Sequence, residues 1–104
     1  MLKNKTPIFL SLDFETTGSN PDKDSIIEVG AFLFTYNSEG ELIELDKISQ
    51  LVFTEHEIPP IVSAITGISN EDLVGQPKLS SVLPKLEGLI EKCDYIVGHN
   101  IFLI

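Results

Sequence analysis

The sequence predicts an α/β domain whose mixed sheet starts with three antiparallel strands and continues with a helix and a parallel strand. Apolar runs with strand character occupy the first half, and turn-forming residues separate them. Helical periodicity is strongest near residues 80–92, before a last short apolar run. With 104 residues, 42% of them hydrophobic, the chain suffices for one domain with one core.

The first strand is expected within residues 8–18, an apolar run that ends in two carboxylates, two hydroxyls and a glycine. Side chains alternate along a strand, which places Asp13 and Glu15 on one face, about 6–7 Å apart, and Phe14 on the other. Carboxylates at this spacing suit divalent ions, either one ion each or one ion shared. In an alternative interpretation, Asp13 caps a following turn and Glu15 is a solvated neighbour.

Residues 19–25 predict a polar turn, and residues 26–36 predict a second strand covered on both faces. One face is expected to carry Ile27, Val29, Ala31 and Leu33, and the other Ile26, Phe32 and Phe34. Glu28 is interpreted as a structural, hydrogen-bonded acid and not as a metal ligand. Residues 37–40 predict a hairpin turn. Residues 41–54 should then return antiparallel, with apolar contacts from Leu42, Ile43, Leu45, Ile48, Leu51, Val52 and Phe53.

The second half of the chain predicts helical turns, a longer helix and a short strand. A turn over residues 61–65 should stop at Gly67 as a C-cap, and Ser69 should cap the next turn, with Ile68 packing on Leu73. A helix is expected from Ser80 or Ser81 to Lys92, with Pro84 in its first turn. Its core stripe should contain Leu79, Val82, Leu83, Leu86, Ile90 and Cys93. Residues 95–98 then predict a strand parallel to the first, joined by a right-handed crossover.

Two segments resemble the first motif and second strand of the DEDD superfamily of 3′-to-5′ exonucleases, of the proofreading-subunit and ribonuclease T type. They are Asp13-Phe14-Glu15-Thr16-Thr17-Gly18 and Ile26-Ile27-Glu28-Val29-Gly30-Ala31. The resemblance implies a ribonuclease H-like sheet and removal of terminal nucleotides of DNA or RNA by a two-metal mechanism with Mg²⁺ or Mn²⁺. It implies that Asp13 and Glu15 are the metal-binding and catalytic residues. The residues implied to bind the terminal nucleotide are Phe14, Thr16, Thr17 and Asn100.

The resemblance is incomplete near the last residues. Gly98-His99-Asn100 resembles the second motif, but Leu103 stands where the family has an Asp after a Phe. The third motif, with its general base and final Asp, has no counterpart. We therefore expect one domain over residues 1–104 that is incomplete at its C-terminus and has impaired activity. Two carboxylates alone should bind Mg²⁺ weakly, and water activation lacks its base.

Charge and hydropathy restrict the partners. The formal net charge of −9 argues against a protein that coats duplexes, since it opposes the attraction to phosphate. It permits an enzyme that grips the 3′ end of a single strand through metal ions, which invert the local charge. A DNA polymerase subunit is a candidate protein partner. No segment approaches the ~18 apolar residues of a membrane span, and the first residues do not form a signal peptide, so we expect a cytoplasmic location.

Two other functions remain open at this point. The first is a non-catalytic remnant that binds a polymerase or another protein partner, suggested by the missing carboxylates, the acidic surface and the apolar residues 101–104. The second is an aspartyl-phosphate phosphatase with Asp13 as its nucleophile. It fits less well, because that chemistry calls for a second Asp where Glu15 stands.

Overall fold

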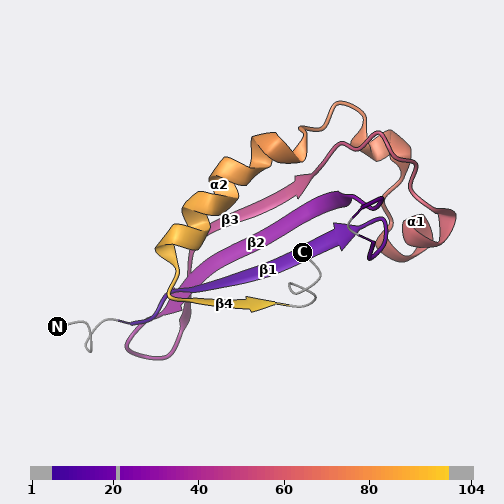
Figure 1. The fold of residues 1–104 in the computed structure, drawn as a ribbon. Coiled ribbons are helices and arrows are strands. Elements are labelled where there is room, and N and C mark those ends of the chain that lie inside the picture. The colour runs from indigo at the N-terminus through magenta and orange to yellow at the C-terminus, as the bar shows by residue number, and fades with distance from the viewer. Residues whose placement is uncertain (1–5, 21, 99–104) are drawn as a thin grey trace.

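The computed structural model describes residues 6–20 and 22–98. Three strands come first: β1 (Phe9–Thr16), β2 (Ile26–Tyr36) and β3 (Leu42–Leu51). Helix α1 (Pro60–Thr66), the 3₁₀ helix η2 (Asn70–Leu73), helix α2 (Leu79–Lys92) and strand β4 (Tyr95–Gly98) follow, as Figure 1 shows. The predicted order of strands and helices is therefore confirmed for the described residues.

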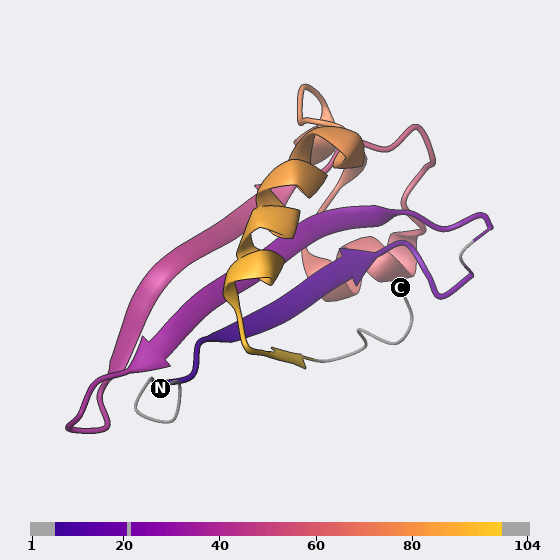
Figure 2. The ribbon, with the colours of Figure 1, turned by 60° about the vertical axis from the view of Figure 1, so that its left-hand side comes forward.

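The four strands form one mixed sheet in the order β3-β2-β1-β4. β2 is antiparallel to both β1 and β3, whereas β4 is parallel to β1, with Phe9 opposite Tyr95. The entry to β4 is fixed by three hydrogen bonds. The Ile8 amide donates to the Asp94 carboxylate (2.8 Å), and the amides of Asp94 and Tyr95 both donate to the Ile8 carbonyl (2.7 and 3.2 Å). The predicted parallel crossover is confirmed, with α2 lying along one face of the sheet (Figures 1 and 2).

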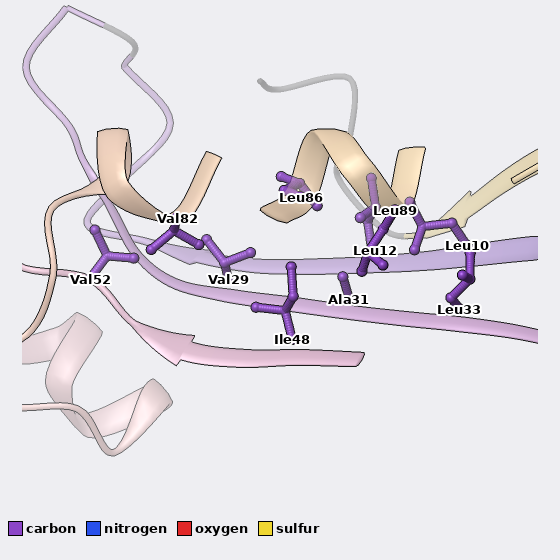
Figure 3. Packing of buried hydrophobic residues seen from close by; sticks show 10 residues of the cluster. All are labelled: Leu10, Leu12, Val29, Ala31, Leu33, Ile48, Val52, Val82, Leu86 and Leu89. Atoms are coloured by element: carbon purple, nitrogen blue, oxygen red, sulfur yellow. The ribbon is translucent and has the colours of Figure 1, made fainter. Parts of the chain in front are cut away.

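The main core lies between α2 and the sheet (Figure 3). The side chains of Leu10 and Leu12 point to this face from β1, and Leu86 and Leu89 of α2 lie toward them, whereas Val82 of α2 lies further along the layer. The remaining members of the cluster are Val29, Ala31, Leu33, Ile48 and Val52. Each buried aliphatic side chain of this kind contributes about 1.5–3 kcal/mol of transfer free energy, so this layer holds α2 against the sheet.

Helix α2 differs from the prediction in three details. It begins at Leu79, so Pro84 is its sixth residue and lies inside the helix, where it cannot donate to the Ser80 carbonyl. Leu89 is fully buried, whereas Leu83 and Ile90 are 39% and 38% exposed. The buried positions, Val82, Leu86 and Leu89, recur at spacings of four and three residues. The buried stripe therefore passes through Leu89, and Leu83 and Ile90 lie at its edges.

Strand β3 also buries less than predicted. Leu42, Ile43 and Leu45 are 40–49% exposed, whereas Ile48 and Val52 are buried as expected. Leu42 and Ile43 belong to the end of the hairpin, which extends beyond the end of α2 (Figure 2), and Leu45 lies at a bulge, since Leu33 pairs with Asp46 and Phe34 with Glu44. The apolar contacts expected from the first half of β3 are therefore wrong for these three side chains.

A bulge in β2 moves two side chains to faces other than those predicted. Glu15 pairs with Glu28 but Thr16 pairs with Ile26, so the register shifts by one residue at Ile27. Ile26 therefore packs against the α2 core. Ile27 instead anchors a second buried cluster with Ile58, Ile68 and Leu73. The expected packing of Ile68 with Leu73 is confirmed, and the bulge lets one strand contribute to two cores.

The sheet face opposite α2 carries a ladder of aromatic rings. Phe9 stacks on Phe34 and on Tyr95, with ring centroids 5.4 and 5.7 Å apart, and Phe32 stacks on Phe34 at 5.4 Å. Phe32 and Phe34 are only half-buried, and Tyr95 is 58% exposed. The prediction that β2 is covered on both faces is thus wrong for these rings within the described residues. No helix of the described residues is long and apolar enough to cross a membrane.

Two glycines in helices should respond to alanine in opposite directions. Gly67 ends α1 with φ 77°, as predicted for a C-cap, whereas Gly88 lies inside α2 with nothing within 4 Å of an added Cβ. We expect Gly67→Ala to lower the free energy of unfolding by about 1 kcal/mol, because alanine resists the left-handed conformation. We expect Gly88→Ala to raise it by about 1 kcal/mol, since alanine favours the helix. Urea unfolding of both variants measures the difference, and equal signs would contradict it.

Candidate functional site

Strand β1 places Asp13 and Glu15 on the sheet face that α2 does not cover. Leu12 belongs to the α2 core and Phe14 packs against it, and side chains alternate along the strand. Asp13 is exposed and Glu15 is half-buried, opposite Gly30 and Glu28 of β2 respectively. The predicted sharing of one face by the two acids, with Phe14 on the other, is confirmed.

Gly30 keeps the space beside Asp13 open. A Cβ added at Gly30 would lie 2.9 Å from the Asp13 carbonyl oxygen, so a larger residue does not fit without movement. The missing side chain leaves a shallow hollow of about 270 Å³ on this face. Its lining comprises Ser11, Asp13, Gly30, Ala31, Phe32, Lys47 and Ile48. The hollow gives an ion or a phosphate access to Asp13 from the open face of the sheet.

Two carboxylates, those of Asp13 and Glu28, act on Glu15. Partial burial raises the pKa of Glu15, and the charges of Asp13 and Glu28 raise it further. Glu28, interpreted from sequence as a hydrogen-bonded structural acid, receives no hydrogen bond on its carboxylate from the residues that the structure describes. It therefore acts on Glu15 mainly through its charge.

The chemistry of these donors fits a hard divalent cation. Mg²⁺ and Mn²⁺ prefer oxygen ligands, and Mg²⁺ is commonly held by one or two carboxylates together with water and substrate phosphate. The mutual repulsion that raises the pKa of Glu15 is the interaction that a cation would relieve. Within residues 6–20 and 22–98, no group of three or more His, Cys, Asp or Glu is arranged to hold an ion alone. Protein ligands at this face would thus fill only part of a coordination shell.

Glu15→Gln should stabilise the metal-free protein at neutral pH. Because the pKa of Glu15 is raised on folding, the folded state binds more protons than the unfolded state between the two pKa values, and stability falls as the pH rises through the folded pKa. We expect the melting temperature in EDTA to rise by on the order of one or two degrees at pH 7. At pH 3, below the pKa of unfolded Glu, the increase in melting temperature should vanish, because the carboxyl group is protonated in both states.

The control for this experiment is Glu44→Gln, which neutralises an exposed carboxylate of β3 and should leave the melting temperature unchanged at both pH values. Thermal unfolding followed by circular dichroism gives the comparison. A gain from Glu15→Gln that persists at pH 3 would show that charge repulsion is not its cause.

The loop after β1 is held by its own hydroxyls. Thr17 is 5% exposed; its Oγ1 donates to Asp24 Oδ1 (3.1 Å) and accepts from the Ser25 amide (2.9 Å). Thr16 Oγ1 donates to the Gly18 carbonyl (2.8 Å). Backbone pairing adds a bond from the Thr17 amide to the Ser25 carbonyl (2.9 Å). These contacts fix the conformation of Thr16, Thr17 and Gly18 directly after Glu15.

A second hollow, of about 360 Å³, lies beside this loop, and Thr16, Ser25, Thr54 and Leu79 are among its lining residues. Most of its hydroxyls are already engaged. Thr54 Oγ1 donates to Ser25 Oγ (3.1 Å), and Ser25 Oγ is hydrogen-bonded to His56 Nδ1 (2.9 Å). Groups that bond to one another in this way stabilise the loop and leave few partners for a ligand.

The structure brings five of the six predicted site residues into one segment of β1 and its loop. Asn100 lies outside the described residues. Sequence reasoning did not single out Gly30, Asp24 or the charge of Glu28 as parts of this region. The positions of Gly30 and Glu28 opposite the acids follow from the register of β1 with β2. The sequence does not fix this register, because the length of the connecting turn is uncertain. Asp24 is one of several polar residues in that turn, and its residue type alone does not distinguish it from Asp22.

Comparison with known proteins places this geometry among nucleases. The family described as exonuclease, of the RNase T type, matches residues 10–104. A PolC-type DNA polymerase III of Thermotoga petrophila is 39% identical over 92 residues, which are 88% of this chain and 6% of that protein. The 3′-5′ exonuclease DinG of Staphylococcus epidermidis is 37% identical over 93 residues, 89% of this chain and 10% of that protein. The chain thus spans a tenth or less of the length of these two relatives.

Solved structures agree on the fold. Exonuclease I of E. coli, in complex with a dT13 oligonucleotide, superposes with a TM-score of 0.71 at 21% sequence identity. The match covers 90% of this chain and 20% of that one. At this identity the likeness concerns the arrangement of strands and helices, and it confirms the ribonuclease H-like sheet predicted from the sequence.

Proposed function

Because this chain belongs to the RNase T family of exonucleases, we propose that it contributes to a site that removes nucleotides from 3′ ends of single-stranded DNA. One observation carries the proposal: Asp13 and Glu15 share the open face of the sheet beside the hollow at Gly30. The fixed loop of Thr16, Thr17 and Gly18 follows them directly. Acids that bind cations and a rigid backbone that receives a nucleotide thus lie next to each other in the chain.

Enzymes of this family generally use divalent metal ions, and we propose Mg²⁺ or Mn²⁺ for this chain. Asp13 and Glu15 would hold the ions, with substrate phosphate and water as further ligands. Bound there, the ions would polarise the phosphate and lower the pKa of the attacking water. Glu28 adds negative charge opposite Glu15, which favours a cation over a neutral ligand at this position.

The chain's own residues have distinct parts in this proposal. Asp13, exposed beside the hollow, and Glu15, half-buried, would hold the cations through their carboxylates. The loop at Thr16 and Thr17 orients the terminal nucleotide, since its hydrogen bonds hold the backbone before substrate arrives. Such preorganisation lowers the entropy lost on binding. Phe14 supports the segment from the opposite face by packing against the α2 core.

The proposed partners are the 3′ end of a DNA strand and a DNA polymerase. One relative is a PolC-type DNA polymerase III that contains a similar segment within 6% of its length. The net charge of −9 argues that the strand is bound at its end and not along a diffuse basic surface. A DNA substrate is therefore expected to bind only in the presence of divalent ions.

The proposed activity is tested with single-stranded DNA labelled at either end. With Mn²⁺ present, we expect a 3′ label to be released at once as a mononucleotide, and a 5′-labelled strand to shorten stepwise. EDTA should stop both reactions. A strand with a 3′-phosphate in place of the hydroxyl is a useful control, because its end differs only in charge and size. Cleavage inside a circular single strand would contradict the exonuclease assignment.

A second candidate function is binding to a polymerase without catalysis. The exposed rings of the open sheet face favour it, since half-exposed aromatic side chains are common at protein interfaces. Tyr36→Ser and Tyr95→Ser should then abolish capture of a purified polymerase, while no release of a 3′ label is seen for the unaltered protein. Release of the label that requires Asp13 would exclude this function as the sole one.

A further inference from the structure

The loop between β1 and β2 contains one half-buried acid, Asp24, whose two carboxylate oxygens both accept hydrogen bonds within the loop. Its Oδ1 accepts from Thr17 Oγ1 (3.1 Å) and its Oδ2 accepts from the Asn20 amide (2.9 Å). Its neighbour Asp22 is exposed. Both donors precede Asp24 in the chain, so its carboxylate ties the end of the loop to its beginning. Hydrogen bonds to a charged acceptor are stronger than neutral ones.

Gly18 shows how tightly this carboxylate is seated. A Cβ added at Gly18 would lie 2.5–2.9 Å from the three carboxyl atoms of Asp24. Only a glycine fits here while the Asp24 carboxylate keeps its place, and a larger residue must displace that carboxylate. The backbone itself is not unusual, since the φ of Gly18 lies outside the left-handed range. Asp24 thus contacts the last residue of the segment that runs from the acids of β1 into the loop.

We propose that Asp24 is a positioning residue for the 3′-terminal nucleotide. It fixes the Thr17-Gly18 backbone that follows Glu15, so that the loop receives the nucleotide without rearranging. The inference rests on the proposed exonuclease function and adds to it a residue outside the metal-binding pair. Asp24 itself touches neither an ion nor the substrate; it acts through Thr17 and Gly18.

The position of Asp24 predicts a separation of kinetic constants. Ion binding depends on β1, which the sheet holds, whereas nucleotide binding depends on the loop. Asp24→Ala should therefore raise KM for a dT oligonucleotide about tenfold, with kcat within threefold and Mn²⁺ affinity within twofold of the unaltered protein. A merely structural role would lower the melting temperature and leave KM unchanged below the transition. Asp22→Ala, which removes the same charge from the same loop, is the matched control and should change none of these values.

A second variant tests the contact from the other side. Gly18→Ala should displace the Asp24 carboxylate and raise KM to a similar extent. In the double variant, Gly18→Ala should raise KM no further than Asp24→Ala does alone. Once the Asp24 carboxylate is removed, the added methyl group has room, so the two positions act as one unit. Asp24→Asn keeps one of the two acceptor oxygens and should give an intermediate KM. If the two substitutions raised KM independently, so that the double variant showed the product of the two effects, the inference would be overturned.

The outcomes separate this inference from the proposed function. If the unaltered protein releases no nucleotide from any 3′ end and does not bind a dT oligonucleotide in Ca²⁺, the proposed function fails and the inference fails with it. If it binds without cleaving, the dissociation constant replaces KM and the same tenfold change is expected. If it is fully active but Asp24→Ala has a normal KM, only the positioning role of Asp24 is wrong.

Discussion

Asp13→Ala is expected to abolish release of a 3′ label, with a fall in rate of about a thousandfold or more. Removing one electrostatic group from a preorganised site commonly costs a factor of 10²–10³, and Asp13 also belongs to the pair that would hold the ions. Its side chain is exposed beside the Gly30 hollow, so the loss of activity should occur without unfolding. The melting temperature of the variant should stay within about 2 °C of the unaltered protein.

The Asp13 experiment has a readout besides activity. Titration with Mn²⁺, followed by the electron paramagnetic resonance signal of the free ion, should show weaker binding for Asp13→Ala and for Glu15→Gln. Glu44→Ala removes an exposed carboxylate of β3 and should alter neither binding nor rate. Activity that survives Asp13→Ala would refute the assignment of this acid.

Leu10→Ala is expected to lower the free energy of unfolding by about 3 kcal/mol. Leu10 is fully buried and lies in the layer between β1 and α2 (Figure 3). Truncating a buried leucine removes its transfer free energy and leaves a cavity, which together cost 2–5 kcal/mol. That is a large fraction of the 5–15 kcal/mol typical of a whole domain.

Leu45→Ala provides the matched control, because it makes the same substitution at a residue that is 46% exposed. Its effect should stay below about 0.5 kcal/mol. Urea unfolding of both variants, with the slope against urea compared, distinguishes lost stability from a changed unfolded state. Equal losses at the two positions would mean that the α2 layer is not the principal core.

Local patterns predicted most of the fold. The limits of β2 and β4 were expected to the residue, because turn formers and apolar runs mark them. The C-cap at Gly67 and the cap position of Ser69 followed from residue type as well, whereas the bond from the Ser69 amide to the Asp72 carboxylate appears only in the structure. What failed depended on distant parts of the chain. The bulge at Ile27 arises from the register of β1 on β2, which single-strand periodicity cannot contain.

The candidate site, like the fold, was predictable where local sequence determines it and not where distant parts of the chain do. The shared face of Asp13 and Glu15 follows from strand alternation and was predictable. The hollow at Gly30 and the charge of Glu28 depend on which residues of β2 lie opposite the acids. The hydrogen bonds that Asp24 accepts depend on how a polar loop closes, and a list of turn-forming residues does not state which acid accepts them.

The pairing of β1 with β4 has a consequence for the order of folding. β1, β2 and β3 are joined by short turns, so their ladders close small loops, whereas Phe9 meets Tyr95 only after the whole intervening chain is placed. All four residues of β4 are exposed, so little burial compensates for that late closure. We expect the antiparallel meander to form first and β4 to add last. In the folded protein, the amides of β4 should then exchange with solvent deuterium faster than those of β2, through local opening that leaves the rest intact.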